Sequence, residues 1–204
     1  GTTIHVWAKV IHKSLAQKII VLETIVFDEN GKSIISKKGD LVCKKVFPSM
    51  PIGFWNDPND EKFIRAYFSY YSNVWRHGDY IEINNHGGII IYGRSDATLN
   101  PGGVRIGTSE IYQVVEKNKI IIDSVAVGYQ INNDEKIILF VKLEDSHLLN
   151  KGLIKEIKQL IKNDCSPRHV PEFIVQVSDI PYTINGKKVE IAVKNIIHNV
   201  KVEN

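Results

Sequence analysis

Cysteine is scarce in this chain of 204 residues. Its two cysteines, Cys43 and Cys165, stand far apart, with no Cys-x-x-Cys pair and no histidine cluster beside them. Neither a disulfide framework nor a zinc site is indicated, and the sequence predicts no metal site. Sparing use of cysteine is typical of a reducing compartment, so we expect a cytoplasmic protein of the cytosol.

Long apolar runs are also missing. The longest aliphatic stretches, Ile89–Ile91 and Ile120–Ile122, are soon interrupted by polar residues or glycine, whereas a membrane-spanning helix needs about 20 apolar residues. No signal peptide is recognisable, and we expect no membrane partner. The sequence starts at Gly1 and its only methionine is Met50, which favours a trimmed chain or a fragment.

No strong excess of charge of either sign is present. Lysine and arginine number 26 and aspartate and glutamate 23, a net charge of +3. Basic pairs such as Lys37-Lys38 and Lys44-Lys45 are scattered among acidic residues, without interleaved aromatic residues. We therefore expect no nucleic-acid partner, because such binding depends on clustered positive charge and falls steeply with salt.

The first half of the chain is rich in strand-forming residues. Residues 20–46 hold two such runs around a turn at Asp28–Gly31, the composition of a hairpin. A second hairpin is predicted for residues 80–92, with its turn at 84–88. Residues 48–60 are rich in proline and are expected to form an irregular loop. No long helix is expected in this half.

After Gly93 the pattern changes to alternating helices and strands. The predicted elements are, in order, a helix capped by Thr108, strands at 121–131 and 136–143, a helix over 153–161 that ends before Pro167, a strand at 173–177 and a helix at 189–197. This order predicts an α+β fold of about one hundred residues. We therefore predict two domains, a β-rich one at 1–95 and an α+β one at 96–204.

Four polar clusters stand where these elements change, and each has an ordinary structural interpretation. Asp79, in Arg76–Asp79, could satisfy backbone amides in a turn, and Gly93–Asp96 has the composition of a linker. The glycine-rich stretch Pro101–Gly107 matches neither G-x-G-x-x-G nor G-x-x-x-x-G-K-[ST]. Pro181–Lys188, with the sequence PYTINGKK, contains a strong turn pair and two lysines that need no special role.

Taken in order, however, these clusters resemble one family. HGD, then GRSDATLNPGGVRIGTSEIY, then PYTINGKK are similar, in order and approximate spacing, to the C-terminal signature of the adenylate-forming acyl-CoA synthetases. The resemblance runs from about Gly39 to Val200. Within the family, SMPIGFWNDP, VWRHGDY and IPYTINGKKVEIAVKNII are most similar to the branch that joins acetoacetate to coenzyme A using ATP. The implied fold is the end of a large N-terminal domain followed by a mobile α+β domain.

The resemblance implies nucleotide-binding roles for three residues. Asp79 matches the aspartate that holds the ribose hydroxyls, since a carboxylate can accept from both. Arg94 matches an arginine that reaches the same side of AMP. Arg105 matches an arginine that neutralises nucleotide phosphate with its planar guanidinium. Asp96 matches the hinge about which the small domain turns.

The resemblance also implies coenzyme A contacts and a catalytic lysine. Gly103 matches the glycine beside the pantetheine path, where a missing side chain permits close approach. Lys162 and Arg168 could contact the coenzyme A phosphates, and a plain surface role is the alternative for each. Lys187 matches the catalytic lysine, which bridges the carboxylate substrate and the α-phosphate. Its neighbour Lys188 is expected to be solvated.

The implied reaction has two steps. Acetoacetate attacks the α-phosphate of ATP with Mg²⁺ present, which gives an acyl-adenylate and pyrophosphate. The small domain then rotates, and the coenzyme A thiol attacks the acyl-adenylate. A lysine on a movable turn can serve one half-reaction and withdraw for the next. Acetoacetate, ATP, coenzyme A and the N-terminal domain are the expected partners.

The chain also departs from the family pattern. Many members carry threonine in place of His77, lysine in place of Asn100 and a basic residue in place of Glu190. No Ser/Thr/Gly-rich phosphate loop ending in Pro-Lys occurs in the sequence, and Gly1–Thr3 echoes only part of one. We therefore expect a C-terminal portion of a ligase that is inactive alone.

Two alternatives remain open at this point. The activated acid could be acetate or propionate, because the acyl pocket belongs to the N-terminal domain. The chain could instead be a non-catalytic binding module that kept the fold. The joint presence of Lys187, Asp79, Arg94 and Arg105 argues against the second alternative.

Overall fold

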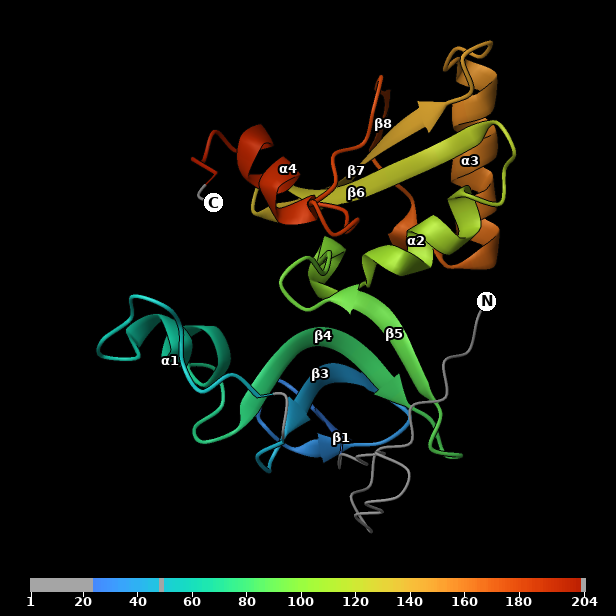
Figure 1. Cartoon of the computed structure of the whole chain (residues 1–204). Coiled ribbons are helices and arrows are strands. Elements are labelled where there is room, and N and C mark those ends of the chain that lie inside the picture. Colours follow the sequence, from blue (N-terminus) through green and yellow to red (C-terminus); the bar gives the residue numbers. More distant parts are fainter. Residues whose placement is uncertain (1–23, 48–49, 203–204) are drawn as a thin grey trace, which may run out of the picture. The chain divides into compact units, whose positions relative to one another are not determined.

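The structure is a computed structural model that describes residues 24–47 and 50–202. One compact unit ends at Ser95 and a second begins at Asp96. Figure 1 labels most of their helices and strands. The start of the first predicted strand at 20–23, the beginning of the predicted loop at 48–49 and the Gly1–Thr3 echo lie outside the described residues.

The first unit is an antiparallel sheet with one short helix. Its described elements are β1 Thr24–Phe27, β2 Ser33–Ile34, β3 Lys38–Cys43, α1 Glu61–Tyr67, β4 Trp75–Ile83 and β5 Ile89–Arg94. The strand order is β2-β1-β3-β4-β5, and every neighbouring pair is antiparallel. Figure 1 shows β3, β4 and β5 as neighbouring curved strands. The predicted hairpin at 80–92 is confirmed as β4–β5. The two runs predicted within 20–46 pair antiparallel as β1 and β3, but the strand directly after the turn at Asp28–Gly31 is the short β2, which the sequence did not predict.

One polar side chain organises the turn of each hairpin. The Asp28 carboxylate accepts hydrogen bonds from the backbone N–H groups of Asn30 and Lys32, both at 2.9 Å. The Asn84 amide oxygen accepts from the N–H groups of His86 at 3.0 Å and Gly88 at 2.8 Å. Aspartate and asparagine favour turns because their short side chains can accept hydrogen bonds from the backbone N–H groups that follow them.

Helix α1 was not predicted from the sequence. The Asp57 carboxylate accepts from the backbone N–H groups of Lys62 at 3.1 Å and Phe63 at 2.9 Å, which satisfies donors in the first turn. The helix places the Tyr67 ring flat on the Trp75 indole, with ring centroids 3.7 Å apart. Seven residues are too few to show a helical period in the sequence, and tertiary stacking stabilises the helix instead.

A buried carboxylate fastens the end of the first unit. Asp40 is 1% exposed and accepts from the Tyr71 hydroxyl at 3.0 Å and from Arg76 at 3.2 and 3.3 Å. The Ser95 hydroxyl donates to the other side of the same carboxylate at 2.5 Å. The Ser95 amide also donates to the Gly78 carbonyl at 2.8 Å. Side-chain and backbone bonds therefore hold the last residue of this unit.

The second unit is a small mixed sheet with helices on both faces. Its described elements are the 3₁₀ helix η1 Pro101–Gly103, α2 Thr108–Val115, β6 Ile121–Ile131, β7 Asp134–Leu143, α3 Lys151–Asp164, the 3₁₀ helix η2 Pro167–His169, β8 Phe173–Gln176 and α4 Glu190–Ile197. The strand order is β6-β7-β8, antiparallel and then parallel. The predicted α+β fold and its element order are confirmed. No described helix is long and apolar enough to cross a membrane.

Strand β7 divides the core of this unit. Leu139, Val141 and Leu143 pack with the apolar faces of α2 and α3. Ile138 and Phe140, at the alternate positions of the same strand, pack on the opposite side with apolar residues of α4. Because side chains alternate along a strand, one apolar run fills two layers. Near-continuous hydrophobicity in β6 and β7 follows from this cover on both faces.

The predicted cap of helix α2 is wrong. Gly107 is the N-cap residue, and its N–H donates to the Glu110 carboxylate at 2.9 Å. Thr108 is the first helical residue and is 2% exposed. Its hydroxyl donates to the Glu190 carboxylate at 2.9 Å. The Thr108 hydroxyl therefore bonds to a carboxylate 82 residues further along the chain, and does not cap the backbone N–H groups of its own helix as the sequence pattern predicted.

Replacement of Asp40 by alanine should destabilise the first unit selectively. The Ser95 and Tyr71 hydroxyls would lose their bonds to this carboxylate, with Tyr71 keeping the Asp28 carbonyl, and Arg76 would lose its counter-charge. These losses cost about 3 kcal/mol of unfolding free energy. All three tryptophans of the chain precede Asp96, so urea unfolding followed by tryptophan fluorescence reports this unit alone.

The exposed Glu29→Ala variant is the matched control, with an expected change below about 0.5 kcal/mol. Equal unfolding free energies for the two variants would contradict the assigned role of Asp40.

Candidate functional site

Two predicted nucleotide residues lie side by side on the first unit. Asp79 in β4 pairs directly with Arg94 in β5. The Arg94 guanidinium is 3.6 Å from one Asp79 oxygen, and His77 Nδ1 is 2.8 Å from the other. The Asp79 side chain is 22% exposed and that of Arg94 47%. Both can therefore reach a ligand while still bonded to each other.

A steric constraint explains why glycine occupies position 78, in the middle of the HGD motif. Gly78 has φ +90°, and a Cβ there would lie 2.6 Å from Nη2 of Arg94. Arg94 also donates to the His77 carbonyl at 3.3 Å, so its guanidinium lies directly over the Gly78 backbone. Only glycine combines this backbone angle with this close approach.

Two carboxylates at the start of β7 hold the glycine-rich loop before α2. The Asn100 N–H donates to Glu135 at 2.6 Å, and the Gly102 N–H donates to Asp134 at 2.9 Å. Glu135 is only 6% exposed. The loop is therefore a fixed structure, in contrast to the loose linker that its glycines alone would allow.

Gly103 and Arg105 occupy this loop. Gly103 has φ +75°, and a Cβ there would meet no atom within 4 Å. Arg105 donates from Nε to the Thr98 hydroxyl at 3.0 Å. Arg168 donates from Nη1 to the Gly102 carbonyl at 3.2 Å, so it lies against the same loop. The structure thus places Arg168 against Gly102, the residue before Gly103.

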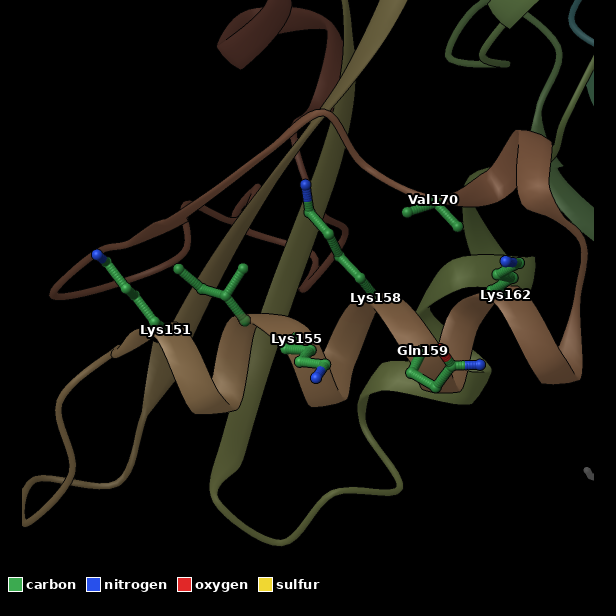
Figure 2. A pocket seen from close by; sticks show the side chains of 7 residues that line it. Lys151, Lys155, Lys158, Gln159, Lys162 and Val170 are labelled. Atoms are coloured by element: carbon green, nitrogen blue, oxygen red, sulfur yellow. The ribbon is translucent and has the colours of Figure 1, made fainter.

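Lys162 lies apart from Arg168, on a lysine-rich face of α3. This face has a hollow of about 360 Å³, lined by Lys151, Ile154, Lys155, Lys158, Gln159, Lys162 and Val170. Figure 2 shows how the labelled lysines project from α3. Arg168 lines another hollow, of about 280 Å³, beside Pro101 and Gly102. Val170 lines both hollows. The two predicted phosphate contacts therefore occupy neighbouring sites and do not converge on one point.

Lys187 stands on the tip of a tight hairpin. The Thr183 N–H donates to the Lys187 carbonyl at 2.8 Å, and the Lys187 N–H donates to the Thr183 hydroxyl at 3.1 Å. Gly186, with φ +71°, makes the turn possible. The Lys187 side chain is exposed, and its ammonium has no ion pair or hydrogen bond with any residue that the structure describes. It is therefore available to a ligand.

The expectation that Lys188 is solvated is wrong. Its side chain is only 17% exposed, and its ammonium lies 2.6 Å from Glu116 and 2.8 Å from Asp123. It also donates to the Ser124 carbonyl at 2.7 Å and lies 4.1 Å from the centre of the Tyr112 ring. Two adjacent lysines thus have opposite environments.

Residues on both sides of Lys188 make parallel contacts. The Tyr182 hydroxyl donates to Asp123 at 2.6 Å, and Glu190 accepts from the hydroxyls of Thr108 at 2.9 Å and Tyr112 at 3.0 Å. These bonds tie the base of the hairpin and the start of α4 to α2 and β6. Sequence reasoning missed them because the partners are 59 to 82 residues apart and share no local pattern.

The contacts around Lys188 shift the pKa values of the neighbouring acidic groups. Partial burial raises the pKa of Asp123, but hydrogen bonds from Lys188 and Tyr182 outweigh it, and the net pKa lies below the ordinary 3.8. Burial and the nearby Asp123 carboxylate raise the pKa of Tyr182. Burial, with Glu190, raises the pKa of Tyr112 well above 10.0. At neutral pH Asp123 is charged and both tyrosines keep their protons.

Comparisons with known proteins agree on one family. No protein-family model matches the chain. The chain is 49% identical over 179 residues to acetoacetyl-coenzyme A synthetase of Rhizobium meliloti and 50% identical over 173 residues to acetoacetyl-CoA synthetase of Xenopus tropicalis. The solved acetoacetyl-CoA synthetase from Streptomyces lividans superposes with a TM-score of 0.82 at 38% identity. Over most of its length the chain is similar to acetoacetyl-CoA synthetases, and its structural neighbours are adenylate-forming acyl-CoA ligases.

These alignments cover most of this chain and a small part of each relative. They span 88%, 84% and 89% of the chain, in the order just given, and 28%, 26% and 27% of those proteins. A benzoate CoA ligase from Burkholderia xenovorans superposes with a TM-score of 0.70 at 26% identity. The chain therefore spans about a quarter of the length of the acetoacetyl-CoA synthetases that it matches, and its fold matches their C-terminal part.

Acid should weaken the contact between Asp123 and Lys188. Because the folded pKa of Asp123 lies below 3.8, its stabilising effect is complete above that value and is lost as the pH falls through the folded pKa. Urea unfolding of the wild type and of Asp123→Asn, followed by far-ultraviolet circular dichroism, should give a difference in unfolding free energy that is largest near neutral pH.

That difference should shrink toward zero as the pH falls below the ordinary carboxyl range. A difference that stays constant from neutral to acid pH would show that the Asp123 charge has no part in stability.

Proposed function

We propose that this chain supplies the mobile C-terminal domain, and the strands before it, of an acetoacetate–CoA ligase. The reaction joins acetoacetate to coenzyme A and converts ATP to AMP and pyrophosphate. The observation that carries the proposal is the exposed Lys187 on its tight hairpin, in a chain about half identical to acetoacetyl-CoA synthetases.

In the first half-reaction a carboxylate oxygen of acetoacetate attacks the α-phosphorus of ATP, and pyrophosphate leaves. The Lys187 ammonium would offset the negative charge that gathers on the α-phosphate oxygens. Asp79 would accept from the ribose hydroxyls while Arg94 borders the same side of the nucleotide. Arg105 would pair with phosphate through its guanidinium.

Magnesium would reach the site on the ATP phosphates as part of the substrate, because Mg²⁺ prefers phosphate and water oxygens. The described residues contain no group of three or more His, Cys, Asp or Glu side chains placed to hold a metal ion. The role proposed for this chain is therefore to bind the phosphates and leave the coordination of the ion to the rest of the ligase.

In the second half-reaction the coenzyme A sulfur attacks the acyl carbon of the adenylate, and AMP leaves. We propose that residues 96–204 rotate about Asp96 between the two steps, while Ser95 stays bonded to Asp40. Gly103 would line the pantetheine path. Lys162 and Arg168 would pair with coenzyme A phosphates from their two neighbouring hollows.

These 204 residues should not complete the reaction alone. The sequence contains no Ser/Thr/Gly-rich phosphate loop ending in Pro-Lys, and the matched part of each relative is about a quarter of its length. The proposed partner is the upstream part of the same ligase, which would supply the acyl pocket. With only two cysteines in the chain, the proposed compartment is the reducing cytosol.

The test uses the natural polypeptide that carries these residues. It should convert acetoacetate, ATP and coenzyme A to acetoacetyl-CoA, AMP and pyrophosphate in equal amounts. Lys187→Ala should lower acyl-adenylate formation by about 10²- to 10³-fold, because one preorganised charge at the transferring phosphate is lost. The matched control is Lys201→Ala, at another exposed lysine, which should keep wild-type activity.

Three results would overturn parts of this proposal. Faster turnover of acetate or propionate would assign a different acid. A natural polypeptide with no adenylate formation would favour the non-catalytic binding module. Thioester formation by the 204 residues alone would remove the need for an upstream partner.

A further inference from the structure

We propose that Lys188 is a positioning residue, whose ion pairs with Glu116 and Asp123 anchor the hairpin that presents Lys187. The inference rests on the proposed function, because it takes Lys187 as the residue that acts in acyl-adenylate formation. Lys188 itself would touch neither nucleotide nor substrate. Its role is to hold the base of the hairpin in a fixed position, from which the exposed tip at residues 183–187 extends.

The anchor lies at the base of the hairpin. Tyr182 and Lys188 face each other across an antiparallel bridge, and the Val189 N–H donates to the Pro181 carbonyl at 3.4 Å. From this base the Tyr182 hydroxyl and the Lys188 ammonium bond to the two oxygens of one carboxylate, that of Asp123. Both strands of the hairpin are therefore held at one point on β6.

A second carboxylate completes the anchor from another element. Glu116, directly after α2, accepts from Lys188 at 2.6 Å and from the Ser124 hydroxyl at 2.8 Å. The Lys188 ammonium thus separates two carboxylates that would otherwise repel each other. A neutral residue at position 188 would leave both without their counter-charge, so the hairpin base would lose its preferred position.

The tip beyond this base has few bonds of its own. Residues 183–187 are exposed, and the hydrogen bonds within the tip join Thr183, Gly186 and Lys187. The place of the Lys187 ammonium therefore depends on the base. A misplacement of about 1 Å at a reacting group can cost about 100-fold in rate.

This arrangement predicts an uneven effect on the two half-reactions. Lys187 acts when the acyl-adenylate forms and is withdrawn when the thiol attacks. Loss of the anchor should therefore slow the first half-reaction and spare the second. A merely structural loss, in which the whole domain weakens, would slow both.

Hydrogen exchange of this 204-residue chain tests the anchor directly. In Lys188→Met, the amides of Thr183, Gly186 and Lys187 should exchange about tenfold faster or more, while amides of β6 keep their protection. Lys187→Met makes the same chemical change one residue away, at an exposed side chain, and should leave these rates unchanged. Tyr182→Phe, which removes one hydrogen bond only, should give a smaller change in the same direction.

Half-reaction kinetics of the natural polypeptide test the positioning. Lys188→Met should lower acetoacetate-dependent pyrophosphate exchange about 10- to 100-fold. Thioester formation from supplied acetoacetyl-adenylate should stay at the wild-type rate. Lys188→Arg keeps the charge and should restore most of the first half-reaction.

The outcomes separate this inference from the proposed function. Unchanged exchange of the tip amides in Lys188→Met overturns the anchor. An equal fall in both half-reactions overturns the positioning role in favour of a structural one. A wild-type polypeptide that forms no adenylate overturns the proposed function and the positioning role together, and hydrogen exchange then still decides the anchor.

Discussion

The part-buried ammonium of Lys188 makes the contacts on which the C-terminal hairpin depends. It joins the end of α2, the start of β6 and a segment 64 to 72 residues further along the chain. An exposed ion pair contributes little to stability because water and salt screen it. Here two carboxylates, a carbonyl and an aromatic ring surround the ammonium and shield it from most of the water. Removal of the lysine would leave the two carboxylates without their counter-charge.

A buried charge has the same use in the first unit. Asp40 gathers two hydroxyls and a guanidinium around one carboxylate and thereby fastens Ser95. Asp40 holds Ser95, the residue before the proposed hinge Asp96, and Lys188 directly follows Lys187. A hinge or a movable arm is defined by the rigid point from which it moves. We infer that the adjacent rigid point is what makes each movement reproducible.

Much of the fold was predictable because its signals are local. Turn residues such as Asp28 and Asn84 bond to backbone within four positions, and the apolar period of α3 is visible over 14 residues. The predictions that were wrong, the Thr108 cap and the solvated Lys188, failed because carboxylates far along the chain decide both. Helix α1 was not predicted because its seven residues are too few to show a helical period.

The sequence by itself determined the resemblance to acyl-CoA synthetases, the order of the elements and the choice of most candidate residues, since ordered motifs and periodic apolar positions are read along the chain. The tertiary structure alone decided which neighbour of a pair is buried, how Asp79 meets Arg94, and that Lys162 and Arg168 line separate hollows. These depend on groups brought together from distant positions. A lysine has the same chemistry at 187 and 188, and only the surrounding carboxylates distinguish the two.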